Sequence, residues 1–253
     1  MLTAKQRDAY LSRIGYSGPV EPTLAVLREL QYRHLFSVPY ETLDIMNGVP
    51  LDLTTEGLYD KIVTRRRGGY CFELNALFGE LLRTLGFAAE FRFARYLRRE
   101  TGIPKRRHQV IVVTLPEGEY LTDVGVGAPI PVRPVRISPE RQRDERGCWF
   151  CDTDPEFGTV LFEMTDAGPE RVYAVPAERS YPVDFLTTSY FCEHSPDSLF
   201  RKALMVSLRT PEGRNTVSGN EFRIFQGDRV TVLKPADERE FRALLQKYFG
   251  LTY

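Results

Sequence analysis

The spacing of apolar residues changes near residue 86, and this change limits the fold more than any other feature of the chain. In the first third, leucines recur at roughly helical intervals, as at Leu24, Leu27, Leu30 and Leu35. From residue 88 onward, short runs suited to strands are separated by turn signals such as Pro116-Glu117-Gly118. A helical part followed by a strand-rich part predicts an α+β protein.

The same patterns predict individual elements and three units. Helices are expected from Pro22 to Val38, from about Thr54 to Val63, and from Tyr70 to Leu85, where Gly86 suits a C-terminal cap. Strands are expected at residues 88–97, 108–115, 120–126, 159–164, 171–175, 221–225 and 229–233, around Trp149, and a last helix at 237–249. We therefore predict a helical unit at 1–86, a β-rich unit at 87–195 and an α/β unit at 196–253.

Composition narrows the environment of the protein. The 253 residues carry 34 basic and 34 acidic side chains, so net charge gives no argument for binding nucleic acid or an anionic membrane. No apolar run approaches the ~20 residues of a membrane span, and the N-terminus lacks the apolar core of a secretory signal. Four cysteines in a chain of this kind favour free thiols and a cytoplasmic location.

Cys71 is the strongest candidate for chemistry. It lies in the first turn of a predicted helix, directly after Gly68-Gly69-Tyr70, and Leu74 and Phe78 continue its apolar face. The unpaired N–H groups of a helix N-terminus favour a thiolate and a developing oxyanion. Glycines before the thiol let a substrate carbonyl approach the backbone. A buried structural thiol is the alternative interpretation.

A thiol also needs a base, and the chain has three histidines. His34 lies in a predicted helix and His194 in a polar turn, whereas His108 opens a predicted strand beside a polar loop. Asp123, inside the apolar run Tyr120 to Val126, is the best acceptor to orient His108, since a carboxylate there is costly unless paired. A tight hairpin at Glu117 would leave the two out of register, so we expect a bulge or strong twist. A surface acid is the alternative for Asp123.

The segment Arg66-Arg67-Gly68-Gly69-Tyr70-Cys71-Phe72-Glu73-Leu74-Asn75 resembles the nucleophile motif of the arylamine N-acetyltransferases. Val38 to Leu43 is similar to an upstream segment of that family, and His108 and Asp123-Val124-Gly125 stand where its histidine and aspartate would. The similarity is clear over about residues 22–127. The residues at 40, 42 and 126 depart from the usual pattern, and the smaller Val126 is expected to widen the acceptor pocket.

This resemblance implies a papain-like fold with an N-terminal helical bundle, a central β-barrel and an α/β lid. It implies that Cys71 accepts an acetyl group from acetyl-CoA and passes it to an arylamine or hydrazine, with His108 as base and Asp123 as its orienting partner. Substrate or CoA contacts are expected at Gly69, Tyr70, Gly125, Val126 and Gly127, with no metal. An ion pair between Glu41 and Arg67 is expected near the active turn.

Other functions stay open at this point. The same scaffold suits an amide synthase that releases or closes a polyketide chain on an aryl amine. It also suits a cysteine hydrolase, or a module that binds without catalysis. The sequence leaves the oligomeric state and the physiological acceptor undetermined.

Two further motifs have competing interpretations. Cys148 and Cys151, with Cys192 and His194, could hold zinc, but the spacing favours unligated thiols. The basic residues Arg98-Arg99 and Lys105-Arg106-Arg107 either form a solvated face or help to hold CoA phosphates.

Overall fold

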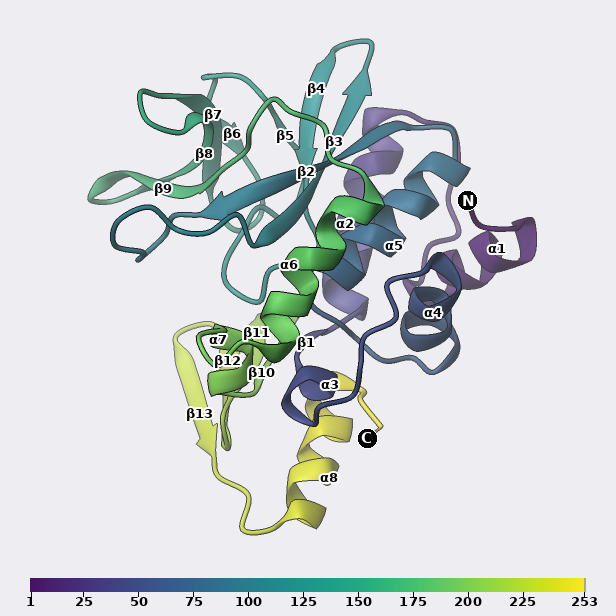
Figure 1. The fold of residues 1–253 in the computed structure, drawn as a ribbon, viewed down its shortest axis with the longest axis vertical. Coiled ribbons are helices and arrows are strands. Elements are labelled where there is room, and N and C mark those ends of the chain that lie inside the picture. Colours follow the sequence, from purple (N-terminus) through teal and green to yellow (C-terminus); the bar gives the residue numbers. More distant parts are fainter. Residues whose placement is uncertain (253) are drawn as a thin grey trace.

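The computed structural model of the chain describes residues 1–252 and begins with helices (Figure 1). The N-terminal elements are α1 (Ala4–Arg13), α2 (Leu24–Ser37), β1 (Tyr40–Glu41), α3 (Leu43–Met46), α4 (Thr55–Tyr59), the π-helical turn η1 (Asp60–Thr64) and α5 (Cys71–Thr84). Helix α5 packs against the neighbouring strands β2 and β3 and presents a broad apolar face to the core. The elements before residue 86 are thus mainly helical, and the unit boundaries at 86 and 195 stay a prediction.

The middle of the chain forms a nearly closed sheet. Its strands are β2 (Ala88–Tyr96), β3 (His108–Leu115), β4 (Gly118–Thr122), β5 (Val135–Arg136), β6 (Gln142–Arg143), β7 (Cys148–Asp154), β8 (Gly158–Thr165) and β9 (Gly168–Ala174). Within residues 1–252 the order is β5-β4-β3-β2-β9-β8-β7-β6. Near the two ends of the sheet, Cys151 N–H donates to the Ser138 carbonyl at 3.0 Å, which brings β7 and the chain after β5 together.

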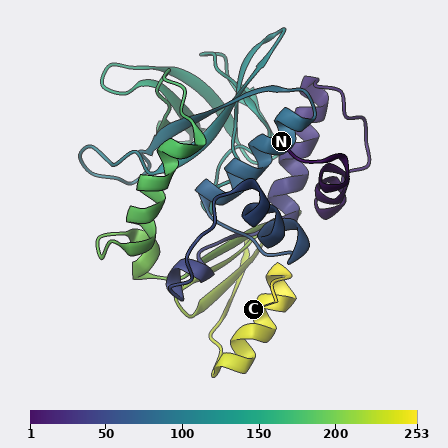
Figure 2. The ribbon, with the colours of Figure 1, turned by 45° about the vertical axis from the view of Figure 1, so that its right-hand side comes forward.

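The last part of the chain is a second sheet with a helix on one face. It contains α6 (Pro182–His194), α7 (Leu199–Lys202), β10 (Met205–Thr210), β11 (Gly213–Ser218), β12 (Glu221–Gln226), β13 (Arg229–Leu233) and α8 (Glu238–Phe249). Strand β1 pairs with β10, so the N-terminal part supplies one edge of this sheet. Helix α8 packs on it through a separate core that includes Phe222, Leu245 and Phe249. Figure 2 shows this sheet and α8 below the barrel.

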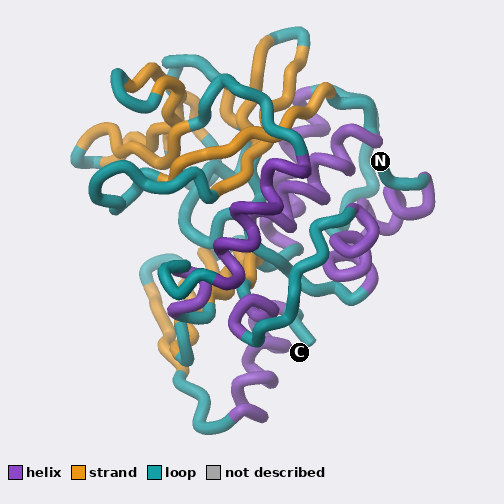
Figure 3. The backbone as a smooth tube through the Cα atoms, in the orientation of Figure 1, coloured by secondary structure: helices purple, strands orange, loops and turns teal. Residues whose placement is uncertain are grey.

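The layers match the predicted α+β arrangement. In Figure 3 the strands form two groups, with helices between and beside them. Several element ends differ from the sequence prediction. Thr23 is the N-cap of α2 and accepts from Val26 N–H, so Pro22 lies outside the helix. The helix predicted to reach Val63 changes to a π-helical turn at Asp60.

His34 lies in the core of the helical part. Its side chain is fully buried, and its Nε2 shares a hydrogen bond with the Tyr10 hydroxyl at 2.9 Å. Burial, and secondarily the charge of Arg13, lowers the pKa of His34 to about 3. The folded protein therefore holds this ring neutral over the pH range in which an unfolded histidine gains a proton.

We expect this group to make stability depend on pH. Because the folded pKa lies below the unfolded value, the His34 contribution is lost as pH falls below ~6.5, by about 2 kcal/mol between pH 7 and pH 5. His34→Gln keeps a hydrogen-bonding side chain without this titration. Urea unfolding at both pH values should show a smaller loss of stability in His34→Gln than in the wild type. The exposed His194, changed to glutamine, is the control. Equal losses in His34→Gln and wild type would contradict the assignment.

Candidate active site

Cys71 is the first residue of α5 and is 2% exposed. Tyr70 precedes it in an extended conformation, and its N–H donates to Glu73 Oε2 at 3.1 Å. This contact satisfies one of the unpaired amides at the helix start and fixes where the chain turns into the helix. The structure thus places the thiol at a helix N-terminus, as the sequence predicts.

The turn before Cys71 rests on the segment that contains β1. Glu41 N–H donates to the Gly69 carbonyl at 2.9 Å, and Tyr40 and Gly69 form a parallel bridge. A Cβ on Gly68 would lie 2.0 Å from the Pro39 carbonyl oxygen. Glycine is therefore required at position 68 by close contact of two backbone segments, in addition to any need for substrate access.

A buried cluster of five charged residues supports this turn. Arg67 Nη2 contacts Glu41 Oε1 at 2.8 Å and Asp44 Oδ1 at 2.9 Å, and Lys61 Nζ contacts Asp44 Oδ2 at 2.7 Å and Glu73 Oε1 at 2.6 Å. The expected pair of Arg67 and Glu41 is thus present within a larger network. Burial raises the pKa of Glu73 to about 7, although Lys61 opposes that shift. The network ties α5, η1 and the β1 segment together.

His108 and Asp123 are in direct contact. His108 Nε2 lies 2.7 Å from Asp123 Oδ2, and both side chains are buried. Strands β3 and β4 pair without a register shift, with Ile111 opposite Thr122. Continuing that register places position 123 diagonal to His108 on the same face of the sheet, within reach of these side chains. The expected bulge is therefore absent from the paired part of β3 and β4, and the ladder ends at Thr122, just before Asp123.

Strand β4 is shorter than predicted, because Asp123 leaves the ladder to bind side chains and backbone. Asp123 Oδ1 accepts from Asn75 Nδ2 and from Gly125 N–H, each at 2.8 Å. Asn75 also donates to the Gln109 carbonyl at 2.6 Å and accepts from Val124 N–H at 2.9 Å. Asn75 is fully buried one helical turn after Cys71. A polar residue on the apolar face of the helix was the available signal for this role.

Cys71 and His108 line one cavity of about 600 Å³. Gly125, Val126 and Gly127, predicted to contact substrate, also line it, whereas Gly69 and Tyr70 do not. The Tyr70 side chain is fully buried and its hydroxyl lies 2.6 Å from Ser189 Oγ. A Cβ on Gly125 would lie 2.7 Å from Cys71 Cα, and one on Gly127 would lie 2.9 Å from the Tyr40 ring.

Other residues that line this cavity come from β2, from the loop before β3, from α7 and from the second sheet, and include Tyr96, Arg107, Phe200, Met205, Ser207 and Thr216. Arg107 belongs to the basic run noted in the sequence, whereas the residues of the second sheet were not among the predicted site residues. The cavity is therefore formed where the helical part, the barrel and the second sheet meet.

Burial and the nearby Cys192 raise the pKa of the Cys71 thiol, while backbone hydrogen bonds from Gln109 and Phe72 lower it. Burial has the largest effect, so a lone thiolate is disfavoured here. The thiol lies 3.7 Å from the Arg107 carbonyl oxygen, next in sequence to His108. An imidazole that accepts the thiol proton would supply the missing positive charge.

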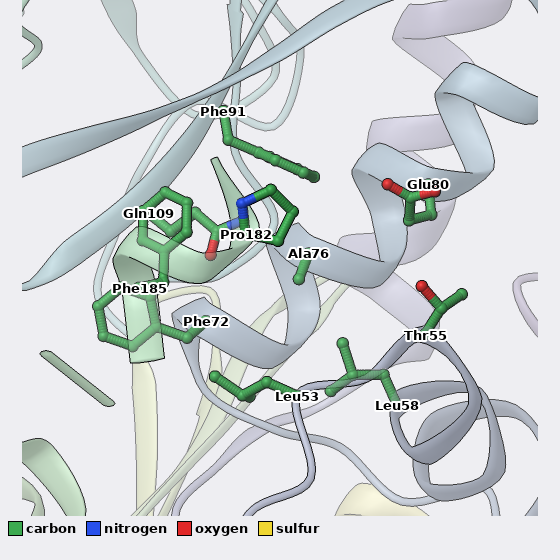
Figure 4. Close-up of a pocket in the computed structure, with 10 residues that line it drawn as sticks. All are labelled: Leu53, Thr55, Leu58, Phe72, Ala76, Glu80, Phe91, Gln109, Pro182 and Phe185. Carbon is green, nitrogen blue, oxygen red and sulfur yellow. The ribbon is translucent and has the colours of Figure 1, made fainter. Parts of the chain in front are cut away.

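A second, smaller cavity of about 40 Å³ lies along one side of α5, where Phe72, Ala76 and Glu80 line it (Figure 4). Gln109 follows His108 on β3 and lines this cavity with Phe72, Phe91 and Phe185. Both polar atoms of the Gln109 side chain are buried and have no hydrogen-bond partner within residues 1–252. Neighbouring residues of one strand thus serve different cavities, since alternate side chains point to opposite faces.

No disulfide joins the remaining cysteines to Cys71 among the described residues. Cys148 and Cys151 lie on β7 and Cys192 on α6, and all are buried and unpaired. No group of three or more His, Cys, Asp or Glu side chains in the described part of the chain could hold a metal ion. Among the described helices, none has the length and apolar character needed to cross a membrane.

Comparison with known proteins agrees with this arrangement. A family model described as "N-acetyltransferase" matches residues 23–253. The arylamine N-acetyltransferase of Mycobacterium tuberculosis is 32% identical over 250 residues, which cover 96% of this chain and 88% of that protein.

Two solved structures are similar over nearly the whole chain. The Salmonella typhimurium enzyme has a TM-score of 0.92 at 27% identity, covering 99% of this chain and 92% of that one. The Mycobacterium marinum enzyme in complex with CoA has a TM-score of 0.88 at 33% identity, covering 96% and 92%. These matches confirm the predicted fold class. The chain belongs to the arylamine N-acetyltransferase family.

Proposed function

We propose that the protein transfers an acetyl group from acetyl-CoA to the nitrogen of an arylamine or arylhydrazine, through a thioester on Cys71. The observation that carries this proposal is one cavity lined by Cys71 and by a histidine that Asp123 orients, in a member of this family. The M. marinum relative was solved with CoA, which supports acetyl-CoA as donor. The four unpaired, buried cysteines fit a reducing compartment, so a cytoplasmic location belongs to the same proposal.

In the first half-reaction, His108 Nδ1 takes the thiol proton and Cys71 Sγ attacks the acetyl carbonyl of the donor. The carbon–sulfur bond to CoA breaks, and the CoA sulfur leaves with the proton that His108 returns. Backbone amides at the start of α5 favour negative charge on the carbonyl oxygen. In the second half-reaction the amine nitrogen attacks the Cys71 thioester, His108 takes a proton from nitrogen, and Cys71 leaves as the amide forms.

The test measures the two half-reactions separately. Acetyl-CoA alone should release one equivalent of CoA per protein and add one acetyl group to the peptide that contains Cys71, as seen by mass spectrometry. Adding a panel of arylamines and arylhydrazines should remove that group and yield N-acetyl products. Cys71→Ala is the matched control and should show neither burst nor mass increase. Normal acetyl transfer by Cys71→Ala would refute the proposal.

A further inference from the structure

Three arginines meet at the turn of the β10–β11 hairpin. Arg209 and Arg214 are directly opposite each other in the register of the two strands. Arg146, from the turn between β6 and β7, reaches the same place and donates to the carbonyls of Thr210 and Pro211. Like charges directly opposite on paired strands are destabilising. The arrangement therefore needs a compensating interaction.

Within residues 1–252, no carboxylate forms an ion pair with any of these three arginines. Arg209 is only 8% exposed; its Nη2 donates to the Ala128 carbonyl at 2.7 Å, and its Nε has no partner. Burial and the charges of Arg146 and Arg214 lower the pKa of Arg209 to about 10. The nearby carboxylate of Asp144 accepts from the backbone N–H groups of residues 132, 146 and 147.

Several other shielded arginines have carboxylate partners, although the buried Arg13 binds three backbone carbonyls and no carboxylate. Arg67 contacts Glu41 and Asp44, and Arg98 contacts two carboxylates of the barrel. The basic run at 105–107 is also partly compensated, because Arg107 pairs with Glu100 and Arg106 lies 3.9 Å from Glu178. The hairpin cluster thus brings three positive charges together with no carboxylate paired to them among residues 1–252, although Arg214 lies over the Phe225 ring and Arg146 over the Phe36 ring.

The cluster lies beside the cavity of Cys71. Alternate residues of a strand share a face, so Arg209 lies on the face of Ser207, and Arg214 on that of Thr216. Ser207 and Thr216 line the cavity, as does Ala128, whose carbonyl binds Arg209. The Arg209–Arg214 pair lies two positions farther along the strands than the Ser207–Thr216 pair, a distance of about 7 Å. An extended ligand lying on this face would reach both Cys71 and the arginines.

We propose that Arg146, Arg209 and Arg214 form a binding site for a phosphate-bearing anion, and that they hold the phosphates of the acyl-CoA donor. The guanidinium fork matches phosphate oxygens, and three such groups suit a ligand with several negative charges. In a CoA thioester the pantetheine arm separates the sulfur from the phosphates, so the phosphates must bind away from Cys71. The donor assignment rests on the proposed function; the anion site itself does not.

The test compares donors with and without phosphates. Arg146→Gln and Arg214→Gln change partly exposed side chains and should fold; Arg209→Gln is the third variant. Each should raise KM for acetyl-CoA roughly tenfold, since a lost charged hydrogen bond is worth about that factor. KM for acetyl-pantetheine should change less than about twofold, because that donor lacks the phosphates that the arginines bind. Arg239→Gln, an exposed arginine of α8, is the matched control and should leave both constants unchanged.

Inorganic pyrophosphate distinguishes a site for free phosphate from a site for the phosphates of the CoA donor. It should raise the melting temperature of the wild type and of Arg239→Gln, and raise it less in the three variants. Protection by pyrophosphate with an unchanged KM for acetyl-CoA would establish a free-phosphate site and overturn the donor assignment. If neither KM nor protection responds, the anion site is refuted. Failure of p-nitrophenyl acetate to acylate wild-type Cys71 would instead count against the proposed function, and the pyrophosphate measurement would still test the arginines.

Discussion

Asp123→Asn should lower kcat/KM for acetyl transfer by roughly 10³- to 10⁴-fold while the protein stays folded. Two donors, Asn75 Nδ2 and Gly125 N–H, both point at Asp123 Oδ1. In the variant that position must therefore keep the amide oxygen, and the NH₂ group must face His108 Nε2. The imidazole would then accept at Nε2 and carry its proton on Nδ1, the only other ring nitrogen, so it could not take the proton of Cys71.

Steady-state kinetics with acetyl-CoA and an arylamine, together with thermal unfolding, measure this prediction. Asp154→Asn is the control, because Asp154 also accepts from two backbone amides but lies on β7. It should retain wild-type kcat/KM. Activity of Asp123→Asn above a tenth of wild type would mean that Asp123 does not set the tautomer of His108.

Gly68→Ala should destabilise the protein by about 3 kcal/mol or more, or prevent folding. The new Cβ would lie 2.0 Å from the Pro39 carbonyl oxygen and 2.8 Å from Glu41 Cγ. The oxygen belongs to the backbone and cannot rotate away. The two segments must therefore separate, which also disturbs the contact between Glu41 and Arg67 beneath the nucleophile.

Denaturant unfolding measures this loss, with Gly102→Ala as the comparison. At Gly102 an added Cβ meets nothing within 4 Å, but φ is +71°, so that variant carries backbone strain without a clash and should lose only about 1–2 kcal/mol. Equal losses in the two variants would show that the contact with Pro39 is unimportant.

The sequence predicted those parts of the molecule whose signals are local. The stripe from Leu74 to Leu85 placed α5 within a residue, and the β-branched run from His108 to Leu115 gave the bounds of β3. Cys71, His108 and Asp123 were chosen from their chemical context, and the last two are in contact. They meet as diagonal neighbours, a contact that the direct pairing of β3 and β4 does not indicate.

The parts that were missed depend on tertiary contacts or on weak local propensity. Helix α6 contains many β-branched and aromatic residues that form helices poorly. Its signals were Pro182 at the first turn and Asp184, which accepts from Tyr181 N–H at 2.7 Å. Strands β10 and β11 carry polar residues on the face that meets the cavity. The role of Asn75 could not be predicted, because its partners come from two strands of the barrel.

The pairing of β1 with β10 has a consequence for how this protein is made. Tyr40 and Glu41 support the turn before the nucleophile, yet their partners, Ser207 and Val206, are synthesised some 165 residues later. Closing so long a segment is slow compared with local helix formation. In a nascent chain that has been synthesised only as far as the barrel, β1 therefore lacks its partner strand β10, and the turn before Cys71 is not fully supported. We expect enzymatic competence to arise only near the end of translation, when the second sheet closes.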